Sequence, residues 1–502
     1  MNTVEPRSVS RLDHLPGPGS FESGFGNKPS YTTDQAAKQL TRQNLRFHDR
    51  NGDSRIDVNY TVDTSFTQAQ QRRVRQAVQS WQDVANINFH EQPGGSDGTL
   101  NIRNNPSGNR GVATFPNRFT TSTSATIGTQ GESRSPALGS HFAVTAIHEI
   151  GHAIGLHHPG DYGRNFDYSK EAVYAEDTKA RTVMSYWSET KQKGHDFKRQ
   201  NPSAPMMDDI AAAQRLYGAN HQTRHTDTTY GFNSNTEREA LSLKSATDQP
   251  VFCVWDGGGV DTLDFSGFAQ DQHINLNAES FSDVGGLKGN VSIAKGCVIE
   301  NAIGGSGRDT LSGNEAANRL KGGGRGDTLK GGGGADTFVY DKASDSTPSD
   351  PDMIEDFISG TDTIDVSGAM KEAGVPALVF TDRFTGRAGE AVLKQDASTG
   401  GSSLAIDLKG TGKADLLVQS KRAIKPADVR WNGHTPGDRP VPAPAPAPAP
   451  TPPAPAPLAD KTQEDTAGLI QLLAITLLGF FSQLLGLLTS PSGQAPAQKN
   501  QV

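Results

Sequence analysis

The sequence predicts an α+β domain followed by an all-β parallel β-roll, a Pro/Ala linker and a hydrophobic C-terminal helix. Three observations lead to this prediction. Helix and strand patterns alternate up to about residue 218, glycine-rich nonapeptides with a fixed aspartate follow, and prolines then alternate with alanines. A chain of 502 residues has room for two or three such domains.

The first part of the chain shows helical periodicity in three places. We predict one helix that opens at residues 34–37, a longer one from about Phe66 to Ala85, and one that begins at Met207 and closes the domain at Tyr217. Residues 87–89 read as a strand. This arrangement indicates a mixed domain in which helices pack on a sheet.

A histidine motif gives the strongest functional signal. The segment that starts at His148 fits H-E-x-x-H-x-x-G-x-x-H at every fixed position. On a helix, His148 and His152 share one face, and Gly155 can end that helix in a left-handed conformation so that His158 reaches the same metal ion. Three histidines leave an open position for water. The motif predicts peptide hydrolysis at one catalytic Zn²⁺, with Glu149 as general base.

Two other interpretations of the motif are a helix whose histidines are packed in the core and a structural metal site. Five fixed positions, with the glycine in place, seldom coincide by chance. Structural zinc sites are normally closed by four protein ligands. The neighbouring His157 does not fit the spacing, so we expect it not to bind the metal.

A second signal, Val183-Met184-Ser185-Tyr186-Trp187, follows about 25 residues later. A long histidine motif followed by such a Met-turn is typical of metzincin metalloproteases, and the Ser-Tyr pair resembles the serralysin branch. The resemblance implies that Met184 packs beneath the metal. It also implies that Tyr186 is a labile zinc ligand that swings away and hydrogen-bonds the developing oxyanion, which suits a weakly binding phenol. An ordinary turn remains the alternative.

Composition restricts the function further. The net charge of −8 argues against nucleic acid as a partner and suits a cation-binding protein. Residues 1–20 contain no apolar core, so we expect no N-terminal Sec signal peptide. Cys253 and Cys297 make no disulfide framework, and we favour buried free thiols over a bridge between them.

Glycine-rich repeats dominate residues 219–432. Residues 304–312 and 331–339 both fit the nonapeptide G-G-x-G-x-D-x-U-x. A period of nine predicts consecutive half-turns of a parallel β-roll. Glycines permit tight turns with inward carbonyls, aspartates supply oxygen ligands for Ca²⁺, and the apolar eighth residue fills the core. Bound calcium would then fold a segment rich in glycine and carboxylates. A flexible glycine linker would not fix the aspartate and apolar positions.

Two weaker copies lie between these repeats. Residues 313–321 lack both the second glycine and the aspartate, whereas residues 322–330 keep Asp327 but have Arg325 where a glycine is expected. We therefore expect fewer calcium ions than a longer, regular roll would bind.

The flanking segments, such as Asp256 to Gly267, also resemble serralysins, and the resemblance covers roughly residues 28–432. It implies several structural Ca²⁺ ions. Carried over position by position, it implies calcium ligands at Arg224, Thr226, Thr228, Asp256, Gly258, Gly259, Asp261, Val298, Glu300, Gly305, Gly307, Asp309, Asp327, Gly332, Gly334, Asp336 and Asp356.

The C-terminal region departs most from that family. Residues 467–489 carry no charge, and as a helix these 23 residues would span about 34 Å, enough to cross a bilayer core. Three interpretations stay open: an altered secretion signal, a surface anchor or self-association helix in contact with a membrane, and a packed structural tail.

These observations divide the chain into six segments. They are a pro-segment (1–22), a zinc metalloprotease domain (23–218), a calcium-binding β-roll with its β module (219–432), a Pro/Ala linker (433–459), a hydrophobic helix (460–490) and a tail (491–502).

We predict a secreted, calcium-stabilised zinc endopeptidase whose protein or peptide substrates bind extended across a cleft. The resemblance also implies export by type I secretion machinery and regulation by a periplasmic protein inhibitor. The alternative is a calcium-dependent cell-surface or adhesion protein with a vestigial protease domain.

Overall fold

A computed structural model describes residues 28–91, 94–95, 97–163 and 166–431 of the chain. The predicted pro-segment, linker, hydrophobic helix and tail lie outside these residues. In the described ranges, no helix is both long and apolar enough to cross a membrane.

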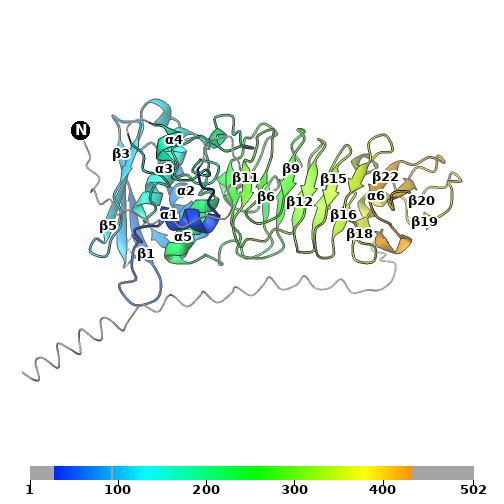
Figure 1. The fold of residues 1–502 in the computed structure, drawn as a ribbon, viewed down its shortest axis with the longest axis horizontal. Coiled ribbons are helices and arrows are strands. Elements are labelled where there is room, and N and C mark those ends of the chain that lie inside the picture. The colour runs from blue at the N-terminus through cyan, green and yellow to red at the C-terminus, as the bar shows by residue number, and fades with distance from the viewer. Residues whose placement is uncertain (1–27, 92–93, 96, 164–165, 432–502) are drawn as a thin grey trace, which may run out of the picture. The chain divides into compact units, whose positions relative to one another are not determined.

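A five-stranded sheet forms one layer of the N-terminal domain (Figure 1). Its order is β2 (Asn88–His90), β1 (Asp57–Val62), β3 (Gly98–Asn105), β5 (Ser122–Gly128) and β4 (Gly111–Ala113). Four strands run parallel, while β4 is an edge strand that pairs antiparallel with β5. One side of β4 therefore has no strand partner among the described residues.

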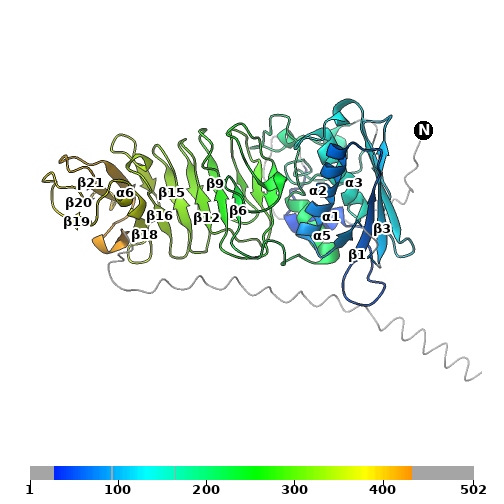
Figure 2. The same cartoon turned by 180° about the vertical axis from the view of Figure 1, so that it is seen from behind.

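Four helices lie between this sheet and the first strands of the next domain, as the views from both sides show (Figures 1 and 2). They are α1 (Thr33–Leu40), α2 (Gln68–Val84), α3 (His141–Ala153) and α5 (Met207–Tyr217). The predicted helices are confirmed to within two residues at α2 and at both ends of α5. Thr67 caps α2 by accepting a hydrogen bond from the backbone N–H of Gln70.

Helix α3 lies almost wholly in the core, and its end redirects the chain. Ser140 caps its start, and Gly155 follows its end with φ of +113°. The positive φ predicted for Gly155 is confirmed, and a lack of space for a side chain also requires glycine here. A Cβ atom at Gly155 would lie 1.9 Å from the carbonyl oxygen of Leu45. Only glycine meets both conditions, so this position fixes the path from α3 to His158.

The C-terminal part is the predicted parallel β-roll. One sheet contains β6 (Thr229–Gly231), β8 (Thr262–Asp264), β12 (Asn301–Ile303), β14 (Arg319–Lys321), β16 (Thr337–Val339), β18 (Thr363–Asp365) and β23 (Val429–Arg430). The facing sheet contains β9 (His273–Asn275), β13 (Thr310–Ser312), β15 (Thr328–Lys330) and β17 (Asp352–Ile354), extended by β22 (Leu416–Ser420), β21 (Ser402–Asp407), β20 (Glu390–Gln395) and β19 (Val379–Phe380).

Consecutive nonapeptides alternate between these two sheets. Strand β13 pairs in parallel with β15, and β14 pairs in parallel with β16. The apolar eighth residues, Leu311, Leu320, Leu329 and Phe338, are all fully buried between the sheets. The degenerate copies therefore keep the strand and the core position, even where their turns depart from the repeat.

A small three-stranded sheet lies at the start of the roll. It consists of β10 (Phe281–Ser282), β11 (Val291–Ile293) and β7 (Phe252–Val254). Cys253 lies in β7, and both it and Cys297 are buried free thiols, as the sequence favoured. Two short helices, α4 (Tyr168–Glu171) and α6 (Ser367–Glu372), complete the main elements.

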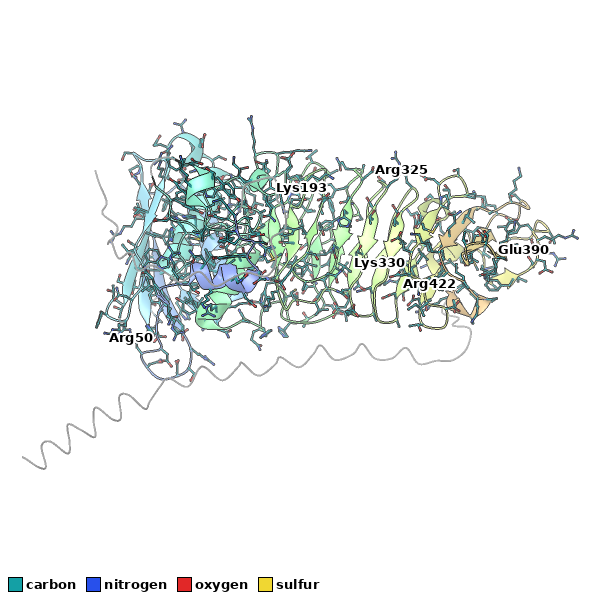
Figure 3. All side chains as sticks on the ribbon, viewed as in Figure 1. Arg50, Lys193, Arg325, Lys330, Glu390 and Arg422 are labelled. Atoms are coloured by element: carbon teal, nitrogen blue, oxygen red, sulfur yellow. The ribbon has the colours of Figure 1, made fainter. Side chains whose placement is uncertain are left out.

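One degenerate repeat keeps a strained backbone. Arg325 stands where the nonapeptide has its third glycine, and its φ is +72°, close to the +87° of the corresponding Gly334. Its side chain is exposed and projects from the roll (Figure 3). A non-glycine residue in this region costs about 1 kcal/mol of folding free energy.

We predict that Gly155→Ala destabilises the N-terminal domain by roughly 2–4 kcal/mol, because it adds both strain and a clash with Leu45. Denaturant unfolding measures the change. Gly52→Ala is the control, since Gly52 has φ of +76° but no atom within 4 Å of the added Cβ. Equal losses in the two variants would contradict the role given to the Leu45 contact.

We predict that Arg325→Gly raises the unfolding free energy of the roll by about 1 kcal/mol, because glycine adopts a positive φ without strain. Thermal unfolding in saturating calcium measures it. Gly324→Ala tests the neighbouring position, where an added Cβ meets its nearest atom at 3.8 Å. A loss of stability in Arg325→Gly would contradict the claim that the positive φ of Arg325 strains the backbone.

Candidate active site

Three imidazoles converge at the C-terminal end of α3. Nε2 of His158 lies 3.2 Å from Nε2 of His148 and 3.0 Å from Nε2 of His152. Nδ1 of His148 donates to the carbonyl of Val183, and Nδ1 of His152 donates to that of Leu156. Because a carbonyl only accepts, both Nδ1 atoms carry the proton and both Nε2 atoms present a lone pair to the point of convergence.

The donor set suits a metal cation. The possible ligand atoms of these three histidines lie within 4.8 Å of one another. Burial lowers the pKa of His148 to about 4 and holds those of His152 and His158 well below the usual value. The imidazoles are therefore neutral at neutral pH, as metal ligation requires. Three neutral nitrogens with one side left open match the ligand pattern of catalytic zinc.

Glu149 lies beside this group and against the edge of the sheet. It is buried, and its Oε2 has no hydrogen-bond partner among the described residues. Burial raises the pKa of Glu149 to about 8. A Cβ atom at Gly111 of β4 would lie 2.3 Å from Oε1, so the carboxylate packs directly on the backbone of the edge strand. The side chain can thus meet a chain that pairs with β4.

Met184 packs against the middle of α3. It is fully buried, and a Cβ atom at Gly151 would lie 2.7 Å from its Sδ. Trp81 of α2 packs at the same place and donates from Nε1 to the carbonyl of Ile147. The sequence predicted Met184 beside the metal but gave no role to Gly151, which occupies a variable position of the motif.

Tyr186 lies beside the histidines with its ring partly in solvent. The side chain is 46% exposed, and its ring centroid is 4.6 Å from that of His158 and 5.7 Å from that of His148. The structure therefore brings together all the residues predicted for the zinc site.

Sequence reasoning missed two residues next to Tyr186. The ring centroid of Tyr162 lies 4.7 Å from that of Tyr186 and 5.0 Å from that of His158. Its hydroxyl donates to Asp177, a fully buried carboxylate that also accepts from Ser185. Burial raises the pKa of Asp177 to about 7. Neither residue belongs to the histidine motif or the Met-turn, so no spacing in the sequence marks them.

His157 points away from the three converging nitrogens. Its ring stacks on Phe115, with centroids 4.5 Å apart, and its backbone N–H donates to the carbonyl of Leu40. Another carboxylate, Asp209 of α5, accepts from the backbone N–H groups of Val183 and Met206. It therefore ties the Met-turn, whose carbonyl orients His148, to the last helix of the domain.

The residues predicted to bind calcium fall on the two edges of the roll, because successive turns alternate between them. One edge holds Gly305, Gly307, Asp309 and Asp327. The other holds Arg224, Thr226, Thr228, Asp256, Gly258, Gly259, Asp261, Val298, Glu300, Gly332, Gly334, Asp336 and Asp356.

The first turns of the roll bring several of these residues into contact. Asp261 accepts from the backbone N–H of Thr228, and its own N–H donates to Glu300. A Cβ atom at Gly259 would lie 2.8 Å from the carbonyl oxygen of Thr226. Val298 has a hydrocarbon side chain, so it could bind calcium only through its backbone carbonyl.

Buried carboxylates on both edges suit cations. Oδ2 of Asp261 and Oδ2 of Asp327 are buried without a hydrogen-bond partner among the described residues. Burial, followed by repulsion from a neighbouring aspartate, raises the pKa of each to about 9. No three carboxylates of the described residues converge as the histidines do. Calcium sites here would therefore depend on backbone carbonyls as well as aspartates.

Comparisons with known proteins agree with both halves of this architecture. The profile of the reprolysin-like metallopeptidase family M12B matches residues 33–212, and that of the peptidase M10 serralysin C-terminal family matches residues 219–429. A metallopeptidase AprA of Pseudomonas marginalis is 48% identical, over 81% of this chain and 92% of that protein. Serralysin G of Dickeya chrysanthemi is 41% identical, over 84% and 95% respectively. The chain belongs to the serralysin family of zinc metalloendopeptidases.

Proposed function

We propose that the protein is a secreted zinc endopeptidase that hydrolyses peptide bonds in extracellular proteins and is stabilised by calcium. The observation that carries this proposal is the convergence of three neutral Nε2 atoms beside the buried carboxylate of Glu149. Family membership supports the same activity. A vestigial protease domain is disfavoured, because each residue of the motif is present and in position.

His148, His152 and His158 would hold the one catalytic zinc ion, with Tyr186 as a fourth, labile ligand. Bound there, zinc would supply Lewis-acid chemistry that polarises the scissile carbonyl and lowers the pKa of water. Glu149 would accept a proton from the attacking water and pass it to the leaving amine. The hydroxyl of Tyr186 donates to the oxyanion that develops during attack.

Edge strand β4 supports an extended mode of substrate binding. Its free side can pair with a peptide, in the way an added strand extends a sheet. The carboxylate of Glu149 packs on the backbone of Gly111 in this strand. A peptide aligned along β4 would therefore present its carbonyl groups beside the general base and the metal ligands.

The roll would hold several structural calcium ions between successive turns on each edge. Neutralising the buried aspartates removes the repulsion between them, so binding contributes directly to folding. We further propose export by type I secretion machinery and control by a periplasmic protein inhibitor, both on the basis of the family. The interpretations of residues 467–489 as secretion signal, anchor or packed tail concern residues outside the described part of the chain.

We predict that Glu149→Gln lowers kcat for casein by at least about 10³-fold, because the general base is lost while the histidines remain. Zinc content by mass spectrometry should stay at one ion per chain. The matched control is Glu132→Gln, an exposed glutamate in the same domain. Near-normal turnover in Glu149→Gln would remove Glu149 from its proposed role.

We predict that Tyr186→Phe lowers kcat by about 10–10²-fold and leaves KM little changed, because the lost hydrogen bond acts mainly on the developing oxyanion. Steady-state kinetics on a fluorogenic peptide measure both constants. A rise in KM at constant kcat would instead indicate that Tyr186 only binds the substrate.

We predict that removing calcium from zinc-loaded protein unfolds the roll, because the paired buried carboxylates then lack a counter-charge. Far-UV circular dichroism should lose its β signal and recover it on calcium addition. A roll that keeps its spectrum and its thermal transition in chelator would contradict calcium-dependent folding.

A further inference from the structure

The residues that support Tyr186 form a connected unit around one buried carboxylate. Oδ1 of Asp177 accepts a hydrogen bond of 2.5 Å from the Tyr162 hydroxyl and one of 2.7 Å from the hydroxyl of Ser185. Ser185 directly precedes Tyr186, and the Tyr162 ring packs on the Tyr186 ring. One carboxylate therefore fixes both the chain before Tyr186 and the aromatic surface against it.

The N-terminal segment holds the loop that carries Asp177. The backbone N–H of Tyr31 donates to Glu176 at 2.8 Å, and the Tyr31 ring stacks on Tyr174 with centroids 4.5 Å apart. Lys28 donates from Nζ to the carbonyls of Ser169 and Ala172. The position of Asp177 is thus set by contacts to the residues that precede it in the loop.

From this geometry we infer that Tyr162 and Asp177 are positioning residues that set where Tyr186 lies relative to His158. The inference rests on the proposed role of Tyr186 as a metal ligand. A ligand that must leave and return needs a defined resting place, and the Tyr162 ring is the surface against which Tyr186 rests. The Asp177 hydrogen bond holds the hydroxyl end of that ring in place.

The test replaces zinc with copper(II), because a phenolate bound to copper(II) gives a visible charge-transfer band. Tyr162→Phe and Asp177→Asn should weaken or shift this band and lower kcat by about tenfold at unchanged KM. Tyr168→Phe is the control, since Tyr168 donates to the Ala175 carbonyl in the same loop. It should leave both the band and kcat unchanged. Thermal unfolding separates positioning from loss of fold.

Tyr186→Phe is the reference and should abolish the band. If the band survives in Tyr186→Phe, then the ligand role of Tyr186 fails and this inference fails with it. If Tyr186→Phe removes the band but Tyr162→Phe and Asp177→Asn keep it at normal kcat, only the positioning role is overturned.

A different observation carries a second inference, about the first degenerate repeat. Nδ2 of Asn314 donates to the carbonyls of Leu276 and Ile299, at 3.0 and 2.8 Å. Nδ2 of Asn318 donates to the carbonyl of Glu300 at 2.9 Å and to Oδ1 of Asn314 at 3.0 Å. Two side-chain amides therefore direct three N–H groups at carbonyl oxygens outside this turn and a fourth at an amide oxygen within it.

The oxygens of the same amides are also paired. Oδ1 of Asn318 accepts from the backbone N–H of Asn314, and Oδ1 of Asn314 accepts from that of Ala316. The turn thus leaves none of these amide groups without a partner. By contrast, the turns with Asp261 and Asp327 bury a carboxylate oxygen that has no partner among the described residues.

The pattern points to a turn of the roll that needs no calcium ion of its own. The amide N–H groups of Asn314 and Asn318 satisfy carbonyl oxygens that a cation would otherwise bind, and they bring no charge to be neutralised. Asn318 still joins the ladder of its edge, because its backbone N–H donates to Oδ1 of Asp336. The turn can therefore hold neighbouring strands in register without a cation bound in it.

The test restores the second glycine and the aspartate of the nonapeptide in N314G/N318D, leaves Ala316 at the position of the third glycine, and compares this variant with N314G/N318A. At a calcium concentration just sufficient to fold the wild-type roll, both variants should lose roughly 3–6 °C of the roll's melting temperature, because the amide donors are gone. At saturating calcium, only N314G/N318D should recover, and native mass spectrometry should count one more calcium ion than in the wild type.

An N314G/N318A variant that melts like the wild type at the limiting calcium concentration would overturn the stabilising role of the amides. An N314G/N318D variant that binds no additional ion would overturn the idea that they replace a cation. A wild-type chain that binds no calcium at all would contradict the proposed function instead, while the melting comparison still decides the role of the amides.

Discussion

Hydrogen bonds from Nδ1 to backbone carbonyls fix the site on which the rest of this structure depends. The Val183 and Leu156 carbonyls determine which nitrogen of His148 and of His152 faces inward. The Val183 carbonyl belongs to the Met-turn, which Asp209 ties to α5. The metal ligands are therefore oriented by backbone groups that α3, the Met-turn and α5 hold in place. These contacts keep the buried, neutral imidazoles in one arrangement.

The roll is joined to this domain through charged groups as well as apolar ones. Asp83, near the end of α2, is buried between the guanidinium groups of Arg224 and Arg238. Arg224 also donates to the carbonyl of Trp255, next to Asp256 at the first turn proposed to bind calcium. Helix α2 in turn contacts α3 through Trp81. The first turns of the roll are thus connected through α2 to α3, the helix that carries the zinc ligands.

Local sequence patterns predicted the elements but not their long-range contacts. The period of 3.6 residues predicted the helices, the period of nine predicted the roll, and the motif spacing predicted the three histidines. All three features depend on residues that are close together in the chain. The need for glycine at position 155 comes partly from Leu45, and the support of Tyr186 comes from Tyr162 and Asp177. The amide pair at Asn314 and Asn318 reads in the sequence only as a degraded repeat, since its partners lie on neighbouring turns.

The most direct test of the account is casein hydrolysis by calcium-refolded protein, measured before zinc removal, after it, and after zinc is returned. We expect that activity disappears when zinc is removed and returns when one zinc ion per chain is restored, while calcium keeps the roll folded throughout. Folded, zinc-loaded protein that cleaves no peptide bond, or activity that persists without zinc, would contradict it.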